Sequence, residues 1–228
     1  MTGLTARDRD ESARVGGGAP TRRPTTVRWL FAVAGALLMP AVGAQPADRP
    51  VAVPPEAVEA LRRQDFAGAL AIVDDALAAS SGAAAPGDPG ALTLRVVRAQ
   101  ACYGLGRLDD AVAALEPFQA VAGDDAPLVS ARVDWSARTV LGDCLMARGE
   151  WAEALLALER ALACVDLQDK VPGEGATTEA ARGRAIDRAT TLSKIGTVKA
   201  RLADWEGARA AFVESEAALA GEPDGGGV

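Results

Sequence analysis

The sequence predicts an all-α fold, a solenoid of αα-hairpins stacked side by side. A short sequence phrase occurs four times. In each copy one helix is expected to end, the chain to turn and a second helix to begin. Around each copy, residues of the same size class return at the same offsets. The composition, with 49% hydrophobic but only 4% aromatic residues, suits a helical core made of many small contacts.

The clearest copy of the phrase spans residues 148–158, where Gly149 ends one helix and Trp151 begins the next. Similar copies lie at 63–70, 105–112 and 202–208. Gly106 occupies the place of Gly149 in the second copy. Because glycine favours a helix end and a tight turn, each copy predicts a pair of antiparallel helices.

The four copies align on an alanine, with a bulky residue three positions before it and another four positions after it. A very small residue stands twelve positions before each alanine, on the preceding helix. The alanines are Ala69, Ala111, Ala154 and Ala208, the bulky residues before them are Phe66, Leu108, Trp151 and Trp205, those after them are Val73, Leu115, Leu158 and Phe212, and the small residues are Ala57, Ala99, Gly142 and Gly196. Small residues that face each other let two helices approach closely, so the columns predict one tight hairpin made four times.

This pattern resembles the tetratricopeptide repeat, whose signature pairs Leu-Gly on the first helix with Ala and a later bulky residue on the second. The residues that carry the resemblance are Leu141, Gly142, Gly149, Trp151, Ala154 and Leu158, followed by Ile195, Gly196, Trp205, Ala208 and Phe212. The resemblance covers roughly residues 54–219 and implies a helical-repeat solenoid. The signature alanines are 42, 43 and 54 residues apart, against about 34 in the family, so longer helices or longer loops are expected.

The N-terminal residues 1–44 have the pattern of a polar, disordered segment followed by a secretory signal. Three arginines, Arg22, Arg23 and Arg28, precede an apolar core at 29–39, and small residues lead to a cleavage point after Ala44. The alternative is a membrane anchor made of residues 29–44, which is shorter than a usual span.

The remaining chain divides into a proline-rich linker at 45–54, a helical repeat domain at 55–219 and a disordered tail at 220–228. The expected hairpins occupy about 55–79, 91–121, 128–165 and 179–219, with Pro55 and Pro127 suited to the first position of a helix. The longest break is expected at 166–178, which contains Pro172, Gly173 and Gly175.

Charge and composition exclude several classes of function. The net charge is −7, and removal of residues 1–44 leaves 18 basic and 28 acidic residues, a net charge near −10. Such a surface repels phosphate backbones, so nucleic acid is not expected as a partner. Histidine is absent, which removes the usual general base and the commonest metal ligand. No cofactor, metal or catalytic residues are expected, and the protein is interpreted as a non-enzyme.

The cysteines and tryptophans have structural interpretations. Cys102, Cys144 and Cys164 are expected to be small buried core residues, with one disulfide between Cys102 and Cys144 and a leftover thiol as the alternative. Trp151 and Trp205 stand in the bulky column, so they are expected to pack in the core and not to form a ligand cage.

In tetratricopeptide-like stacks the first helix of each hairpin lines a concave groove that receives a peptide or a partner's helix. The resemblance places Gln100, Tyr103, Asp143, Met146, Thr197 and Arg201 in such a partner groove, together with Val96, Ser136, Thr139 and Ser193. This lining is neutral and rich in hydroxyls, and it lacks the basic residues that clamp a C-terminal carboxylate. A solvated polar face that binds nothing is the alternative.

The sequence therefore predicts an exported protein–protein interaction or scaffold module of the cell envelope, periplasmic or secreted, whose partner is another protein or a peptide. The alternative is a small-ligand binder or an enzyme that uses a pocket between the solenoid and the 166–178 loop. A self-assembling scaffold, in which the end helices pair between copies, is a third hypothesis.

Overall fold

The computed structural model describes residues 52–80, 88–119, 129–170 and 178–220. Within these ranges every regular element is a helix, which confirms the all-α prediction. The helices are α2 (Pro55–Arg62), α3 (Phe66–Ser80), α4 (Pro89–Gly104), α5 (Leu108–Ala114), α6 (Glu116–Gln119), α7 (Ala131–Arg148), α8 (Trp151–Lys170), α9 (Thr178–Arg201) and α10 (Trp205–Ala220).

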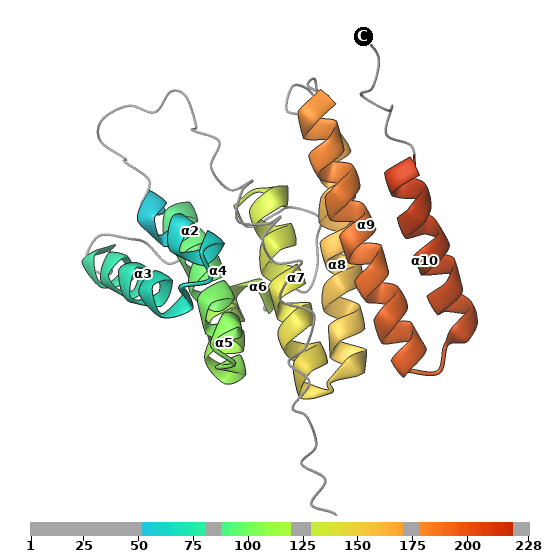
Figure 1. Cartoon of the computed structure of the whole chain (residues 1–228), viewed down its shortest axis with the longest axis horizontal. Helices are drawn as coiled ribbons and strands as arrows, with labels where there is room; N and C mark the ends of the chain where they lie inside the picture. Colours follow the sequence, from blue (N-terminus) through green and yellow to red (C-terminus); the bar gives the residue numbers. More distant parts are fainter. Residues whose placement is uncertain (1–51, 81–87, 120–128, 171–177, 221–228) are drawn as a thin grey trace, which may run out of the picture.

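The helices form packed neighbouring pairs that follow one another along a row (Figure 1). A turn of two or three residues joins α2 to α3, α4 to α5, α7 to α8, and α9 to α10. Contacts of α3 with α4, of α4 and α5 with α7, and of α8 with α9 connect each pair to the next. As expected from the sequence, the second helix of every pair begins at the bulky residue of the repeated phrase.

The turn within each pair has the same backbone conformation in all four pairs. A residue with positive φ stands five positions before each signature alanine, at Gln64 (φ 63°), Gly106 (74°), Gly149 (79°) and Ala203 (62°). At Gly149 the glycine N–H donates to Met146 O (3.1 Å) and the next N–H donates to Leu145 O (2.9 Å). This hydrogen-bond pattern is the Schellman motif, and the other three turns repeat it.

The predicted close approach of the paired helices is observed at both glycines of the small-residue column. A Cβ added at Gly142 would lie 2.7 Å from Leu158 Cδ2, and one added at Gly196 would lie 2.8 Å from Phe212 Cε1. Side chains four positions after the signature alanine thus occupy the space that the glycines leave. The alanines of these columns are also buried, at 0–4% exposure.

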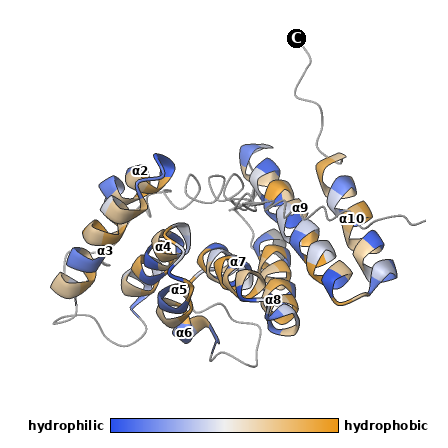
Figure 2. Ribbon diagram, turned by 60° about the horizontal axis from the view of Figure 1, so that its bottom comes forward, coloured by the Kyte–Doolittle hydropathy of each residue, from blue (hydrophilic) through white to orange (hydrophobic). Residues whose placement is uncertain are grey.

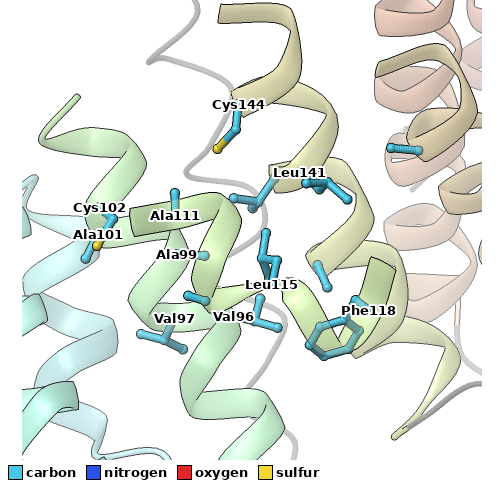
Figure 3. Close-up of a cluster of buried hydrophobic side chains, with 14 of the residues drawn as sticks. Val96, Val97, Ala99, Ala101, Cys102, Ala111, Leu115, Phe118, Leu141 and Cys144 are labelled. Carbon is cyan, nitrogen blue, oxygen red and sulfur yellow. The ribbon is translucent and has the colours of Figure 1, made fainter. Parts of the chain in front are cut away.

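The main hydrophobic core runs from α2 to α10 and is made mostly of small and branched aliphatic side chains. Figure 3 shows its middle, where Leu115 and Phe118 extend between α4 and α7. Cys102, Cys144 and Cys164 are free and buried, so the expectation of core packing is confirmed and the disulfide alternative is wrong.

Three details differ from the sequence prediction. α7 begins at Ala131, not at Pro127, because the Ser130 hydroxyl accepts a hydrogen bond from Val133 N (3.2 Å) and caps the helix. The second helix of the second pair is broken into α5 and α6 next to Pro117, which lacks the N–H that a continuous helix needs. α8 continues through residues 166–170, so part of the expected 166–178 break is helical.

Trp205 is a further correction, because its side chain is 69% exposed and does not pack in the core. Trp151 is half-buried against the core, as predicted. The predicted signal or anchor, linker and tail lie outside the described residues, except residues 52–54 and 220. Among the helices that the structure describes, none is both long and apolar enough to span a bilayer.

Candidate protein-binding face

The first helices of the last three pairs, α4, α7 and α9, bring polar side chains together on one face. α7 provides most of them. Its residues are buried continuously from Val133 to Leu145. The polar members of that stretch include Ser136, Thr139 and Asp143, which lie on one side of the helix at spacings of three and four residues.

Gln100 of α4 and Ser136 of α7 meet at the contact between these two helices. Gln100 Nε2 donates to Ser136 Oγ at 3.3 Å, and the two residues are 5% and 1% exposed. The carbonyl oxygen of the same amide, Gln100 Oε1, has no hydrogen-bond partner in the part of the chain that the structure describes. Within the described residues, the amide nitrogen of Gln100 therefore has a hydrogen-bond partner and the amide oxygen has none.

Asp143 of α7 and Lys194 of α9 form an ion pair between the third and fourth helix pairs. Lys194 Nζ lies 2.6 Å from Asp143 Oδ2, and the two side chains are 15% and 4% exposed. The second carboxylate oxygen, Oδ1, is buried and unpartnered within the described ranges. The lysine neutralises the charge of Asp143 but does not use its full hydrogen-bonding capacity.

Thr139 lies one helical turn before Asp143 and is 2% exposed. Its hydroxyl Oγ1 is the third buried atom of this face without a hydrogen-bond partner among the described residues. We refer to Gln100, Ser136, Thr139, Asp143 and Lys194 together as the polar strip. The strip has no net charge, because its one acid and one base neutralise each other.

A separate set of polar contacts joins the N-terminal half of α7 to α9. Its central groups, Trp135, Thr191 and Asp187, are joined by hydrogen bonds. Trp135 Nε1 donates to Thr191 Oγ1 (2.9 Å), and the Thr191 hydroxyl donates to Asp187 O (2.8 Å). Arg132 Nη1 donates to Asp187 Oδ2 at 2.6 Å. Burial raises the pKa of Asp187 to about 6, against the opposing effect of the Arg132 charge.

The predicted groove residues therefore divide into two groups. Gln100 and Asp143, together with Val96, Ser136 and Thr139, are buried and not openly displayed, which corrects the expectation of an open lining. Tyr103 and Met146 are half-buried, whereas Ser193, Thr197 and Arg201 are exposed along α9. Arg201 stacks over the Trp151 ring, 5.3 Å from its centroid, so its cationic group already has an aromatic contact.

Lys194 was missed by the sequence reasoning. It lies three residues before Thr197 and is therefore its neighbour on the surface of α9. The available signal was the opposite charge of Asp143 in the same predicted groove. The pairing itself depends on how α9 packs beside α7, which the sequence pattern does not specify.

The described residues contain no group of three His, Cys, Asp or Glu side chains arranged to hold a metal ion. Burial raises the pKa of Cys144 to about 12 and that of Cys164 to about 11, so both thiols stay protonated at neutral pH. What the polar strip offers chemically is hydrogen bonding, with two acceptor oxygens and one hydroxyl.

Comparison of the sequence with protein-family models and with curated proteins finds no match.

Proposed function

We propose that this chain is an exported, non-enzymatic protein–protein interaction module, built as a tetratricopeptide-like helical repeat, which holds a segment of a partner protein along the polar strip. The repeat assignment is supported by the turns. Four Schellman turns at the same offset from four signature alanines describe one structural unit used four times.

In the described part of the chain, five buried side-chain atoms have no hydrogen-bond partner. The binding proposal depends on the three that lie on the polar strip, Gln100 Oε1, Thr139 Oγ1 and Asp143 Oδ1. More than nine-tenths of buried polar groups in native proteins are hydrogen-bonded, so three exceptions on one face require an explanation. A ligand segment that supplies hydrogen-bond donors would satisfy all three if it enters where α4, α7 and α9 meet. Because each of the three atoms is buried, these helices must separate to admit it.

The chemistry of the strip indicates what kind of segment fits. Two of the three atoms can only accept hydrogen bonds, so the ligand must donate. Because Lys194 already neutralises Asp143, a cationic ligand gains little charge attraction. Backbone N–H groups and neutral amide side chains of a polypeptide are the donors that fit these two conditions.

Export is supported by the basic, apolar and small-residue pattern of residues 22–44. On this proposal the mature protein works in the periplasm or outside the cell, and its partner is an envelope protein. The net charge near −10 after cleavage makes nucleic acid an unfavourable partner.

The proposal is tested by affinity capture from an envelope extract with the tagged full chain as bait. Thr139→Val removes the hydroxyl and keeps the side-chain volume, so it should lower retention of the partner about tenfold through the loss of one buried hydrogen bond. Glu159→Gln, at an exposed position on α8, is the control and should retain the partner fully.

Equal retention by the wild type and Thr139→Val would show that the polar strip is not the binding face. A second outcome is that no protein binds, while a small molecule raises the melting temperature of the wild type but not of Thr139→Val. The ligand of the polar strip would then be a small molecule and not a protein.

A further inference from the structure

The exposed side of α10 carries a stripe of large hydrophobic side chains interrupted by two opposite charges. Trp205, Phe212, Val213 and Leu219 are 69%, 39%, 58% and 49% exposed. Arg209 and Glu216 lie between them and are exposed. Positions 205, 209, 212, 216 and 219 alternate spacings of four and three residues, which places them on one side of the helix. We call these six residues the α10 stripe.

The corresponding side of α8 is covered in the structure. At the equivalent positions, 54 residues earlier, α8 carries Trp151, Leu155, Leu158, Leu162 and Val165. Leu158 and Val165 are buried, Leu155 and Leu162 pack against the core, and Arg201 of α9 stacks over Trp151. On α8 this side is therefore a packing surface, covered by α7 at Leu158 and by α9 at Trp151.

Relative to α8, the α10 stripe carries two charges, Arg209 in place of Leu155 and Glu216 in place of Leu162. It also carries the apolar Val213 where α8 has the exposed Glu159. α10 lies at the end of the row of helices (Figure 1), and hydrophobic and hydrophilic residues alternate along it (Figure 2). Exposed apolar patches of this kind mark interaction surfaces, and the two charges restrict what can bind.

The order of residues along the stripe is self-complementary. If two copies of α10 lie antiparallel around a two-fold axis between positions 212 and 213, Arg209 of each copy faces Glu216 of the other. The same register sets Phe212 beside Val213 and places Trp205 near Leu219 at both ends. A parallel arrangement would instead set Arg209 against Arg209 and Glu216 against Glu216.

We propose that the α10 stripe is a homodimer interface in which α10 pairs antiparallel with α10 of a second copy of this chain. Two-fold symmetry uses each contact twice, so the dimer contains two Arg209–Glu216 ion pairs and two Trp205–Leu219 contacts. The proposal is independent of the polar strip, which lies on α4, α7 and α9.

The size of the interface indicates a concentration-dependent dimer. α10 has 16 residues and is therefore about 24 Å long. A contact between two helices of this length lies at the small end of specific interfaces. The monomer and dimer should exchange, and their ratio should change across a concentration series.

The test is light scattering and sedimentation of the full chain over a concentration series, with charge-reversal variants. Arg209→Glu and Glu216→Arg each turn both ion pairs into like-charge contacts, so each should raise the dissociation constant about tenfold or more. The double variant, Arg209→Glu with Glu216→Arg in one chain, restores opposite charges in the antiparallel register and should restore dimerisation. Ala210→Glu, an exposed position beside the stripe, is the control and should dimerise like the wild type.

A wild-type chain that remains monomeric throughout the series would overturn the proposal. Dimerisation that is equal in all variants would place the interface elsewhere. If the single variants dissociate and the double variant also stays monomeric, the antiparallel register is wrong. Far-UV circular dichroism of every variant shows whether a loss of dimer is caused by unfolding. If a variant is unfolded, Val213→Asp takes its place in the comparison.

Discussion

Replacement of Thr139 by valine should stabilise this protein, whereas the same replacement at Thr191 should destabilise it. Both threonines are buried, at 2% and 0% exposure, and both lie on first helices of their pairs. They differ in hydrogen bonding. Thr191 accepts from Trp135 and donates to Asp187 O, while Thr139 Oγ1 has no partner in the described part of the chain.

The magnitudes follow from these environments. A buried hydroxyl without a partner costs about 1–3 kcal/mol, and Thr139→Val replaces it with a methyl group of similar size. The free energy of unfolding should therefore rise by about 1–3 kcal/mol. Thr191→Val leaves the Trp135 indole N–H without an acceptor, so the free energy of unfolding should fall by a similar amount, about 1–3 kcal/mol.

Urea denaturation followed by far-UV circular dichroism measures both changes, and the melting temperature should shift by about 2–4 °C per kcal/mol. If Thr139→Val is neutral or destabilising, the Thr139 hydroxyl is already satisfied in the unliganded protein. The polar strip would then have no free hydroxyl at Thr139 for a ligand to bond.

Two further predictions concern the turns and Asp187. Because left-handed backbone favours glycine, Ala203→Gly should stabilise the chain by about 1 kcal/mol, and Gly149→Ala should destabilise it by about 1 kcal/mol. Urea denaturation measures both changes. If the two variants shift stability equally in the same direction, the two turns do not share one conformation. Burial raises the pKa of Asp187 from 3.8 to about 6, so the folded state binds its proton more tightly. Stability should therefore fall by about 3 kcal/mol in total as pH rises from well below 3.8 to well above 6. Asp187→Asn should remove this component of the pH profile, and an unchanged profile would refute its assignment to Asp187.

Much of the fold was predictable because it depends on local patterns. The size of the residue at each column determines how closely two helices approach, and Gly142 against Leu158 shows the predicted contact directly. Helix starts at Phe66 and Trp151 followed from the repeated phrase. Glycine marked only two of the four left-handed positions, so the conformation of Gln64 and Ala203 was visible only in the structure.

The burial of the candidate face was not predictable from periodicity. Polar residues at Ser136, Thr139 and Asp143 indicate a solvated side when α7 is considered alone. In the structure α7 has neighbours on both sides, α4 on one and α9 on the other, so these polar groups become buried and must find partners across helices. Such pairing depends on tertiary packing, which no pattern within one helix encodes.

The pairing of α9 with α10 was predictable, but the environment of Trp205 was not. The column that holds Trp151 and Trp205 gives both the same local position. Arg201 covers Trp151 because another helix follows α8, whereas Trp205 is exposed on the last described helix. Two tryptophans at the same position of the repeat thus have different environments, because α9 lies beside Trp151 and no described helix covers Trp205.

The first helices of the pairs grow longer along the chain, from 8 residues in α2 to 24 in α9. Each residue added to an existing helix adds a backbone hydrogen bond without a new nucleation cost, so the long C-terminal pairs are the place where folding should start. In a stack where each unit rests on its neighbours, order then spreads toward α2. The amide protons of α2 should consequently exchange with solvent first, while those of α7 to α9 remain protected longest.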